Sequence, residues 1–528
     1  MNLLTSLVNR NSSRFPFGHK RLLMPCAIAI FLSVALSILI PTQAIAGSGI
    51  KITALDGIDT LSDISKEIDT NQSAEIVAHE LHYLLEQQGY ILAYPSIVAE
   101  NEVQVRFGKI LRVSVSGFSE KTARLIEDYF QPTLIGVPNI KKIDRALALT
   151  NDIAGVSATV AFAKLANIGE YEAVISGVES TQSGVIAIDT VSQKFFDDKR
   201  VQLQQNFSSV FQGGDLIRLQ GSFVDPKGAP DSQSVYASYL FPIGNHGAYA
   251  ELSAGDVQTA LTVEGRTTPI QFNGGSFILP GSSTNENFEG QSASVTLGYP
   301  LERLHGRATY LIGSVDWSDD ETQRLGDTET TSIDLSLFSR HEKTDGQSVA
   351  YGLTIGAGDT DSYLNGASGT FQYLHGSFGL IQPMNALAKN TELRFELFGQ
   401  ISSDKAAGSK LIGLGSEQSL RGYSNATYTG QTGAWGSIEI AGTVPVDSHW
   451  SSQITPLAFI DFGAVRNSRE NVTRSRPKSD FLASVGTGLR MNFGSSGRLE
   501  GFVGVPLLED GSGRVPDPRT YLRLSWGW

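Results

Sequence analysis

The chain has 528 residues, of which 41% are hydrophobic and 18% charged, and its formal net charge is −13. It contains 55 glycines, 19 prolines and one cysteine. Such a glycine content without a collagen period favours an all-β body over a helical one. The acidic balance and the lack of a basic patch argue against a nucleic-acid partner.

The N-terminus has the features of an export signal. Basic residues up to Arg21 precede an apolar run from Leu22 to Ile40, and Ala44-Ile45-Ala46 is a small-x-small cleavage site. We therefore predict a signal peptide over residues 1–46. An uncleaved anchor is the alternative, because the run is just long enough to span a bilayer. Cys26 would leave with the signal, and the mature protein would then have no disulfide and no thiolate site.

Two small α/β modules are expected next, over residues 47–108 and 109–180. In the first, apolar residues recur at helical spacing between Ser73 and Tyr90, and two strands follow at 91–98 and 103–107. In the second, the patterns predict a strand at 110–116, helices at 120–129 and 140–149, and strands at 157–162 and 171–175. Each module is small but within the range of independently folding domains.

The rest of the chain, residues 181–528, is predicted to be a transmembrane antiparallel β-barrel. Apolar residues alternate with small or polar ones, as in Val295, Leu297 and Tyr299, and every apolar stretch after residue 46 is interrupted within a few positions. One apolar and one polar face is what a barrel with a lipid exterior and a wet lumen requires. A soluble β-sandwich would also alternate, but consecutive hairpins after an export signal favour the barrel. Residues 319–331 are expected to form a long polar loop, and the length allows roughly 14 to 18 strands, with sixteen as the central estimate.

The last strand has a distinctive pattern. Leu522, Leu524, Trp526 and Trp528 share one face of it. This pattern resembles the C-terminal signal by which bacterial outer-membrane barrels are recognised for insertion. The alternative is an ordinary edge strand that happens to end at a tryptophan.

Two short motifs stand out within the predicted barrel. The first is Ser419-Leu420-Arg421-Gly422-Tyr423, where an arginine in a membrane protein is costly unless it has a partner. The second is Phe459-Ile460-Asp461-Phe462-Gly463. In a strand, Asp461 shares its phase with Phe459 and Gly463, whereas Ile460 and Phe462 take the opposite, lipid-facing phase.

Two modules followed by a barrel with these motifs resemble the two-partner secretion transporters of the haemolysin activator/secretion type (TpsB; ShlB/FhaC/HecB), whose periplasmic modules are called POTRA domains. Weaker matches support the resemblance along the chain: Gly89-Tyr90, Asp144-Arg145-Ala146-Leu147, Asn151-Asp152 with Gly155, Gly214-Asp215, and Tyr239-Leu240-Phe241-Pro242-Ile243-Gly244.

The resemblance implies a place in the outer membrane of a Gram-negative-type bacterium, among outer-membrane lipid, with periplasmic POTRA domains. It implies type V protein transport: a pore that recognises and translocates a secreted exoprotein with a two-partner secretion domain, of adhesin or haemolysin type. It also implies insertion by the barrel-assembly machinery. A loop near 405–432 would fold into the lumen with Leu420, Arg421, Gly422 and Tyr423 at its tip, and Asp461 would pair with Arg421. Separate, solvated pore charges are the alternative for this pair.

Two other functions stay open. An assembly factor for outer-membrane proteins would share the modules, barrel and loop, and a passive porin would need neither modules nor loop. No catalytic group set converges in the sequence, so we expect no enzyme, cofactor or metal. His79-Glu80-Leu81-His82 lacks the four-residue histidine spacing of a zinc site. Gly413-Leu414-Gly415 is interpreted as a flexible entry to the loop. Many relatives carry a plug helix before the first module; here either none exists or Thr60–Glu67 is a shortened one.

Overall fold

The computed structural model describes residues 49–54, 64–190, 199–225, 232–259, 268–272, 275–279, 288–322, 326–362, 368–386, 388–403, 410–446, 453–468, 477–511 and 513–528. The predicted signal peptide lies outside these residues. Among the helices described, none combines the length and the apolar character needed to cross a membrane.

The first module packs one helix on a three-stranded sheet. Its elements are β1 (Lys51–Ala54), the short 3-10 helix η1 (Ser65–Glu67), α2 (Ala74–Gln87), β2 (Ala93–Ala99) and β3 (Glu102–Phe107). The strand order is β1-β3-β2, and β1 runs parallel to β3. The Ser73 hydroxyl caps the helix by accepting a hydrogen bond from the Ile76 N–H.

The core of this module includes the described part of the segment considered as a shortened plug. Val77, Leu81 and Leu85 of α2 are buried against β3, and Ile64 is fully buried in the same cluster. The described part of the Thr60–Glu67 segment therefore contributes to the module's core, and the expectation that it could be a plug is wrong for these residues. A side chain committed to one core is not free to close a pore.

The second module has the strand and helix order expected from its sequence. It consists of β4 (Lys109–Ser116), α3 (Glu120–Phe130), η2 (Gln131–Leu134), α4 (Ile140–Asp152), β5 (Val156–Lys164) and β6 (Glu170–Glu179), with the sheet order β4-β6-β5. Ile126, Phe130 and Ile143 of the helices are buried against Ala173 and Ile175 of the central strand.

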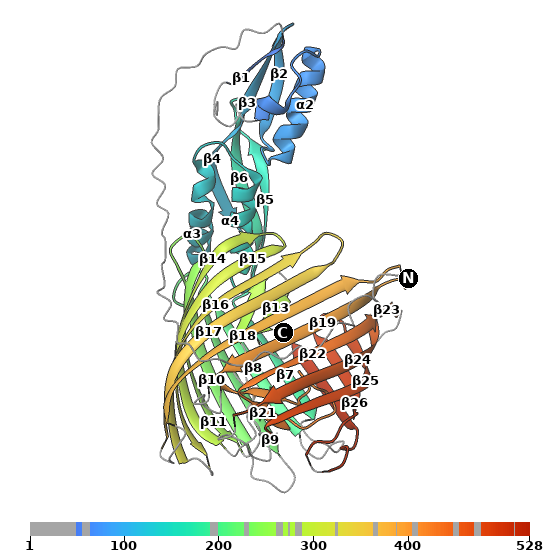
Figure 1. Ribbon diagram of the computed structural model, residues 1–528. Coiled ribbons are helices and arrows are strands. Elements are labelled where there is room, and N and C mark those ends of the chain that lie inside the picture. Colours follow the sequence, from blue (N-terminus) through green and yellow to red (C-terminus); the bar gives the residue numbers. More distant parts are fainter. Residues whose placement is uncertain are drawn as a thin grey trace, which may run out of the picture. The chain divides into compact units, whose positions relative to one another are not determined.

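Figure 1 shows the strands of the barrel. The barrel closes on itself, because the last strand β27 pairs with the first, β7. Its strands are β7 (Gln182–Thr190), β8 (Lys199–Ser208), β9 (Leu216–Asp225), β10 (Ser232–Ile243), β11 (Ala248–Thr259), β14 (Phe288–Leu304), β15 (Arg307–Thr322), β16 (Gly326–Glu342), β17 (Ser348–Ser362), β18 (Gly369–Pro383), β19 (Thr391–Ser402), β22 (Thr432–Gly442), β23 (Val444–Pro445), β24 (Gln453–Arg466), β25 (Ser479–Phe493), β26 (Gly497–Pro506) and β27 (Arg519–Gly527).

Sixteen strands form the barrel, as predicted from its length. β23 pairs with β24 just beyond the end of β22, so β22 and β23 form one interrupted strand. Among the described residues of the barrel region, two short hairpins stand outside the barrel sheet, β12 (Thr268–Phe272) with β13 (Gly275–Leu279) and β20 (Ile412–Leu414) with β21 (Tyr428–Gly430).

The alternation in the sequence separates an apolar outer face from a polar lumen. Val295 and Leu297 are 47% and 56% exposed, whereas Thr296 between them is buried. In β27, Leu524 and Trp526 are exposed on the outer face, as is Trp528 just after the strand. Leu522 in the same phase is partly buried, and Tyr521 is buried in the opposite phase. Side chains of this kind on the outer face match a lipid exterior.

The expected loop at residues 319–331 is wrong. β15 continues to Thr322 and β16 begins at Gly326, and Asp319 pairs with Glu329 across the two strands. These strand ends are polar on both faces, which hides the period-2 hydrophobic signal although the backbone ladder continues.

Candidate functional site in the barrel lumen

The inserted loop, residues 403–431 between β19 and β22, is described from Lys410 onward. Its base is an ordered ladder, since Ile412 pairs with Gly430 and Leu414 with Tyr428. The expectation of a flexible entry at Gly413-Leu414-Gly415 is therefore wrong. Gly415 has a φ of +98°, and a Cβ there would lie 2.1 Å from the Ser424 carbonyl oxygen. The loop is a packed element and not a free tether.

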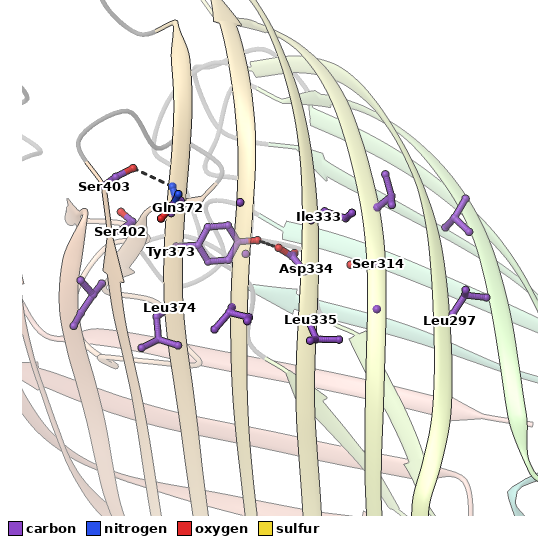
Figure 2. Close-up of a pocket in the computed structure, with 17 residues that line it drawn as sticks. Leu297, Ser314, Ile333, Asp334, Leu335, Gln372, Tyr373, Leu374, Ser402 and Ser403 are labelled. Atoms are coloured by element: carbon purple, nitrogen blue, oxygen red, sulfur yellow. Dashed lines mark hydrogen bonds between the residues drawn. The ribbon is translucent and has the colours of Figure 1, made fainter. Parts of the chain in front are cut away.

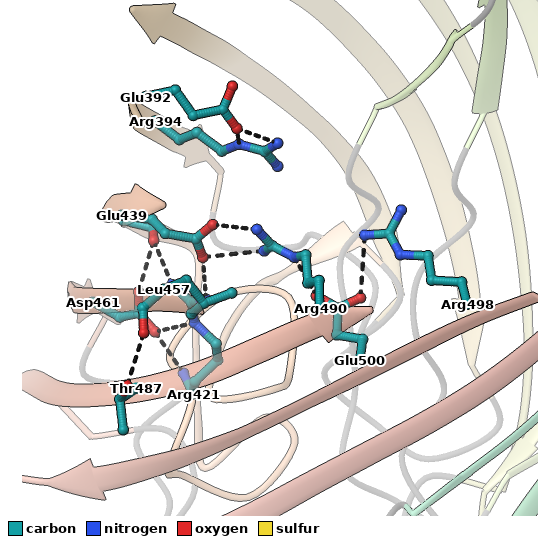
Figure 3. Close-up of polar contacts among 11 residues, drawn as sticks. Glu392, Arg394, Arg421, Glu439, Leu457, Asp461, Thr487, Arg490, Arg498 and Glu500 are labelled. Atoms are coloured by element: carbon teal, nitrogen blue, oxygen red, sulfur yellow. Dashed lines mark hydrogen bonds and ion pairs between the residues drawn. The ribbon is translucent and has the colours of Figure 1, made fainter. Parts of the chain in front are cut away.

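Arg421 and Asp461 form a bidentate ion pair inside the barrel (Figure 3). Nε of Arg421 donates to Oδ2 of Asp461 at 2.9 Å, and Nη2 donates to Oδ1 at 2.9 Å. The backbone N–H of Arg421 also donates to Oδ2 at 2.9 Å. Asp461 is completely buried, while its neighbour Ile460 is half exposed on the outer face. Three donors to one carboxylate fix the position of the loop tip on β24.

The remaining guanidinium nitrogen of Arg421 belongs to a wider chain of charges. Nη1 donates to Glu439 of β22 at 2.7 Å, Glu439 accepts from Arg490 of β25 at 2.6 Å, and Arg490 donates to Glu500 of β26 at 2.8 Å (Figure 3). Cations and anions alternate along this chain across four neighbouring strands. The neighbouring carboxylates compensate the charge of the buried Arg421, whereas an unpaired buried charge would be strongly destabilising.

Two further contacts hold the Arg421 side chain in place. Nη2 lies 2.9 Å from the Ser437 hydroxyl, which itself donates to Asp461 at 2.7 Å. The guanidinium carbon lies 3.5 Å from the centre of the Phe459 ring. Phe459 therefore stacks on the cation.

Three glycines let the loop tip touch the barrel wall. Gly422 has a φ of +105°, and a Cβ on it would lie 2.9 Å from the carbonyl carbon of Gly504 in β26. A Cβ on Gly504 would lie 2.5 Å from the Gly422 nitrogen. Gly463 likewise leaves room for the loop, because a Cβ there would lie 2.8 Å from the Leu414 side chain and 3.0 Å from the Leu420 side chain. Leu420 is fully buried at this contact.

Tyr423 fixes the other side of the tip. Its hydroxyl oxygen lies 2.9 Å from the carbonyl oxygen of Ala483 and 3.0 Å from that of Leu508, and it accepts the Leu508 N–H at 3.1 Å. Arg519 donates to the Tyr423 carbonyl oxygen at 3.1 Å. The four residues Leu420 to Tyr423 thus all contact the barrel.

A third anchor lies at the start of the loop and was missed by the sequence reasoning. Nζ of Lys410 is 3.5 Å from Asp334 of β16 and 3.2 Å from the hydroxyl of Tyr373 of β18. Figure 2 shows Tyr373 pointing at Asp334, to which its hydroxyl donates. The same wall carries a hollow of about 1000 Å³, whose lining is mainly apolar and includes Leu297, Ile333, Leu335 and Leu374 beside Asp334 and Tyr373.

The second module is tied to the barrel by a separate ion pair. Arg303 at the end of β14 donates to both carboxylate oxygens of Asp152 at 2.6 Å, and Tyr310 donates to Asp152 at 3.1 Å. Asp144 accepts the His305 N–H at 2.9 Å, and Arg145 donates to the His246 carbonyl oxygen at 3.1 Å. Asp144, Arg145 and Asp152 of the two motifs therefore bind the barrel at this junction, whereas Asn151 bonds Leu147 and Ala158 within the module.

A polar cluster near the same junction surrounds Glu179. Its carboxylate accepts from the Ser119 N–H at 2.6 Å and from the Thr122 hydroxyl at 2.6 Å, and Thr122 lies 2.9 Å from Ser209. Burial alone would raise the pKa of Glu179, but these hydrogen bonds together lower it below its usual value. Within the described residues, no cluster of three or more His, Cys, Asp or Glu side chains could hold a metal ion.

Comparison with known proteins is consistent with this architecture. The chain is similar in structure to CdiB from Escherichia coli, with a TM-score of 0.71, 15% identity and 93% of each chain covered. It is also similar to CdiB from Acinetobacter baumannii, with a TM-score of 0.65, 14% identity, and 91% of this chain and 90% of that chain covered. At these identities the likeness concerns the fold. A sequence search of curated proteins found no match.

The family comparison is more specific. Residues 178–491, more than half of the chain, match the model described as haemolysin secretion/activation protein ShlB/FhaC/HecB. The matched stretch contains both the Arg421 and the Asp461 motifs. The chain therefore belongs to the ShlB/FhaC/HecB family, the outer-membrane transporters of two-partner secretion.

Proposed function

We propose that this protein recognises one exoprotein with a two-partner secretion domain, of adhesin or haemolysin type, and passes it unfolded through the barrel lumen. The observation that carries the proposal is the inserted loop held by the Arg421–Asp461 pair inside a barrel of this family. A loop that folds into the lumen and is held by a few ionic contacts could close a resting pore and still be displaced. In this role Leu420, Gly422, Phe459 and Gly463 provide the close packing on which the pair depends.

The proposed organisation is a signal peptide at 1–46, POTRA domains at 47–108 and 109–180 in the periplasm, and the barrel at 181–528. The exoprotein would dock an extended segment on the POTRA sheets by strand addition. β2 supports this role, because it is an edge strand of the first sheet and exposes Tyr94, Ile97 and Val98. Folding of the exoprotein outside the cell would give the transport its direction.

We propose that the barrel-assembly machinery recognises the outer face of β27 when it inserts the barrel. Trp528 supports this proposal because it is more than half exposed and ends a row with Leu524 and Trp526. Removing Trp528 should lower the amount of inserted barrel, whereas a change in the lumen should not.

The test is deletion of the gene followed by complementation with the full chain. We expect the loss of one secreted exoprotein from the medium while the levels of other outer-membrane barrels stay constant. A general fall in outer-membrane barrels would instead favour an assembly factor. A large, constantly open conductance in bilayers, with unchanged exoprotein secretion in the deletion strain, would favour a porin.

A further inference from the structure

The barrel's closing seam has the shortest backbone ladder in its neighbourhood. β27 and β7 share five register pairs, from Arg523 with Asp189 to Gly527 with Val185. The adjoining ladders are longer, with eight pairs between β26 and β27 and nine between β7 and β8. Beyond the five pairs, Trp528 and Gly184 exchange two backbone hydrogen bonds at 3.1 Å. Fewer ladder hydrogen bonds make this seam depend more on side-chain contacts.

One such contact crosses the seam, from Arg523 of β27 to Asp189 of β7, and it belongs to a charged cluster that reaches the inserted loop. Arg200 of β8 donates to both oxygens of Asp189 of β7 at 2.9 and 3.2 Å. Arg523 of β27 lies 3.6 Å from the same carboxylate. Arg200 also donates to Glu417 of the inserted loop at 3.0 Å. Two arginines and two carboxylates thus join three strands of the seam region to the loop.

The loop holds Glu417 in a fixed relation to Arg421. The Ser416 hydroxyl accepts from the N–H groups of Gln418 and Ser419 at 3.1 and 3.0 Å, which closes a tight turn around Glu417. Arg421 follows after this turn and binds Asp461 and Glu439 on β24 and β22. The loop tip therefore bridges two parts of the barrel wall, the seam region on one side and the β22–β24 wall on the other.

The contacts of Arg421 and of Glu417 differ in how the barrel groups are left when the loop moves away. Without Arg421, the buried Asp461 loses three of its hydrogen-bond donors. Without Glu417, Arg200 and Asp189 remain paired, because their bidentate contact does not involve the loop. Release of Glu417 is therefore the milder of the two steps, which suits a reversible contact.

We propose that Glu417 is a latch residue: by binding Arg200 it couples docking of the inserted loop to closure of the β27–β7 seam. The seam is stabilised while the loop is docked and becomes weaker when the loop leaves. This inference extends the proposed secretion function, but it concerns the resting protein and does not need an exoprotein.

Hydrogen exchange of the purified full-length protein in detergent tests the latch. Glu417→Gln should speed exchange of the β7 and β27 amides by about tenfold, the order expected for loss of a charged hydrogen bond. The amides of β22 and β24 should exchange as in the unchanged protein. The matched control is Glu392→Gln, which breaks an ion pair with Arg394 inside a single strand. It should leave the seam amides unchanged.

A disulfide across the seam separates the latch from a general loss of structure. Ala187 and Ser525 face each other in the ladder, and the mature chain is expected to contain no other cysteine. In a protein that carries Ala187→Cys and Ser525→Cys together with Glu417→Gln, the oxidised form should show slow hydrogen exchange of the β7 and β27 amides. Reduction of the disulfide should restore fast exchange.

Two results would overturn the latch. One is that the β7 and β27 amides of the Glu417→Gln protein exchange at the same rate as in the unchanged protein. The other is equal acceleration in every strand regardless of the disulfide. Because no secretion is measured, either result leaves the proposed transport function to its own test.

Discussion

Replacing Arg421 with Ala removes a cation whose side chain makes four hydrogen bonds in the lumen. The substitution deletes two hydrogen bonds to Asp461, one to Glu439 and one to Ser437, together with the stacking on Phe459. Asp461 stays fully buried, with the Ser437 hydroxyl still donating to it. We expect the barrel to remain closed, since none of its ladder hydrogen bonds involves the Arg421 side chain.

The size of the effect follows from the burial of the pair. Removing one partner of a buried ion pair costs about 3–5 kcal/mol. At about 1.4 kcal/mol per factor of ten, the undocked fraction of the loop rises by roughly two to three and a half orders of magnitude. Arg421→Lys keeps the charge but loses the bidentate geometry, so its effect should lie between those of Ala and the unchanged protein.

Two assays separate the loop from the barrel. Heat-dependent migration in detergent gels reports the folded barrel, and exoprotein in the medium reports secretion. Arg421→Ala should still show the heat-dependent migration of a folded barrel but should no longer secrete the exoprotein. Adding Asp461→Asn to Arg421→Ala removes the stranded charge and should recover part of the loop docking seen by hydrogen exchange. Normal secretion by Arg421→Ala, with the loop undocked, would refute the reasoning.

Three further substitutions test other contacts. Gly422→Ala should undock the tip and lower secretion, because its Cβ has no room beside Gly504 and the φ of +105° is strained for alanine; unchanged loop exchange would contradict this. Arg303→Gln should loosen the second module from the barrel by leaving Asp152 without its bidentate partner, measured as faster proteolysis between module and barrel. The lowered pKa of Glu179 stabilises the fold above the unfolded-state pKa, and this contribution is lost as the pH falls through the lowered folded-state value. Glu179→Gln should therefore flatten the acid side of the stability profile, and an identical profile would exclude the contribution.

Much of the fold could be predicted because its main signals are local. Module helices and strand alternation are both patterns within short windows, and the strand number follows from length. β1 is different: it has four residues and pairs with β3 about fifty positions away, from Lys51 to Glu102, so no local pattern marks it. The strand ends around Asp319 were missed because both of their faces are polar.

The sequence predicted which side chains of the candidate site point into the barrel. It did not predict which of these side chains bind each other. The alternation placed Asp461 inward and Ile460 outward, which agrees with their burial. Glu439 and Arg490 carry the same inward phase, yet nothing in the sequence states which strands are neighbours or in what register. Arg490 stands opposite Glu500 only because of the register of β25 and β26. Lys410 and Glu417 were missed for a related reason, since a folded loop has no fixed period.

Passage of the exoprotein through the lumen is the central claim, and photo-crosslinking from one strand tests it most directly. Glu396 lies opposite Ser437 and faces the lumen, whereas its neighbour Leu397 faces outward. A photoreactive residue at each position, in cells secreting a stalled exoprotein, should give a crosslink from position 396 and none from position 397. A crosslink from 397 alone, or none from 396 while secretion proceeds, would contradict transport through the barrel.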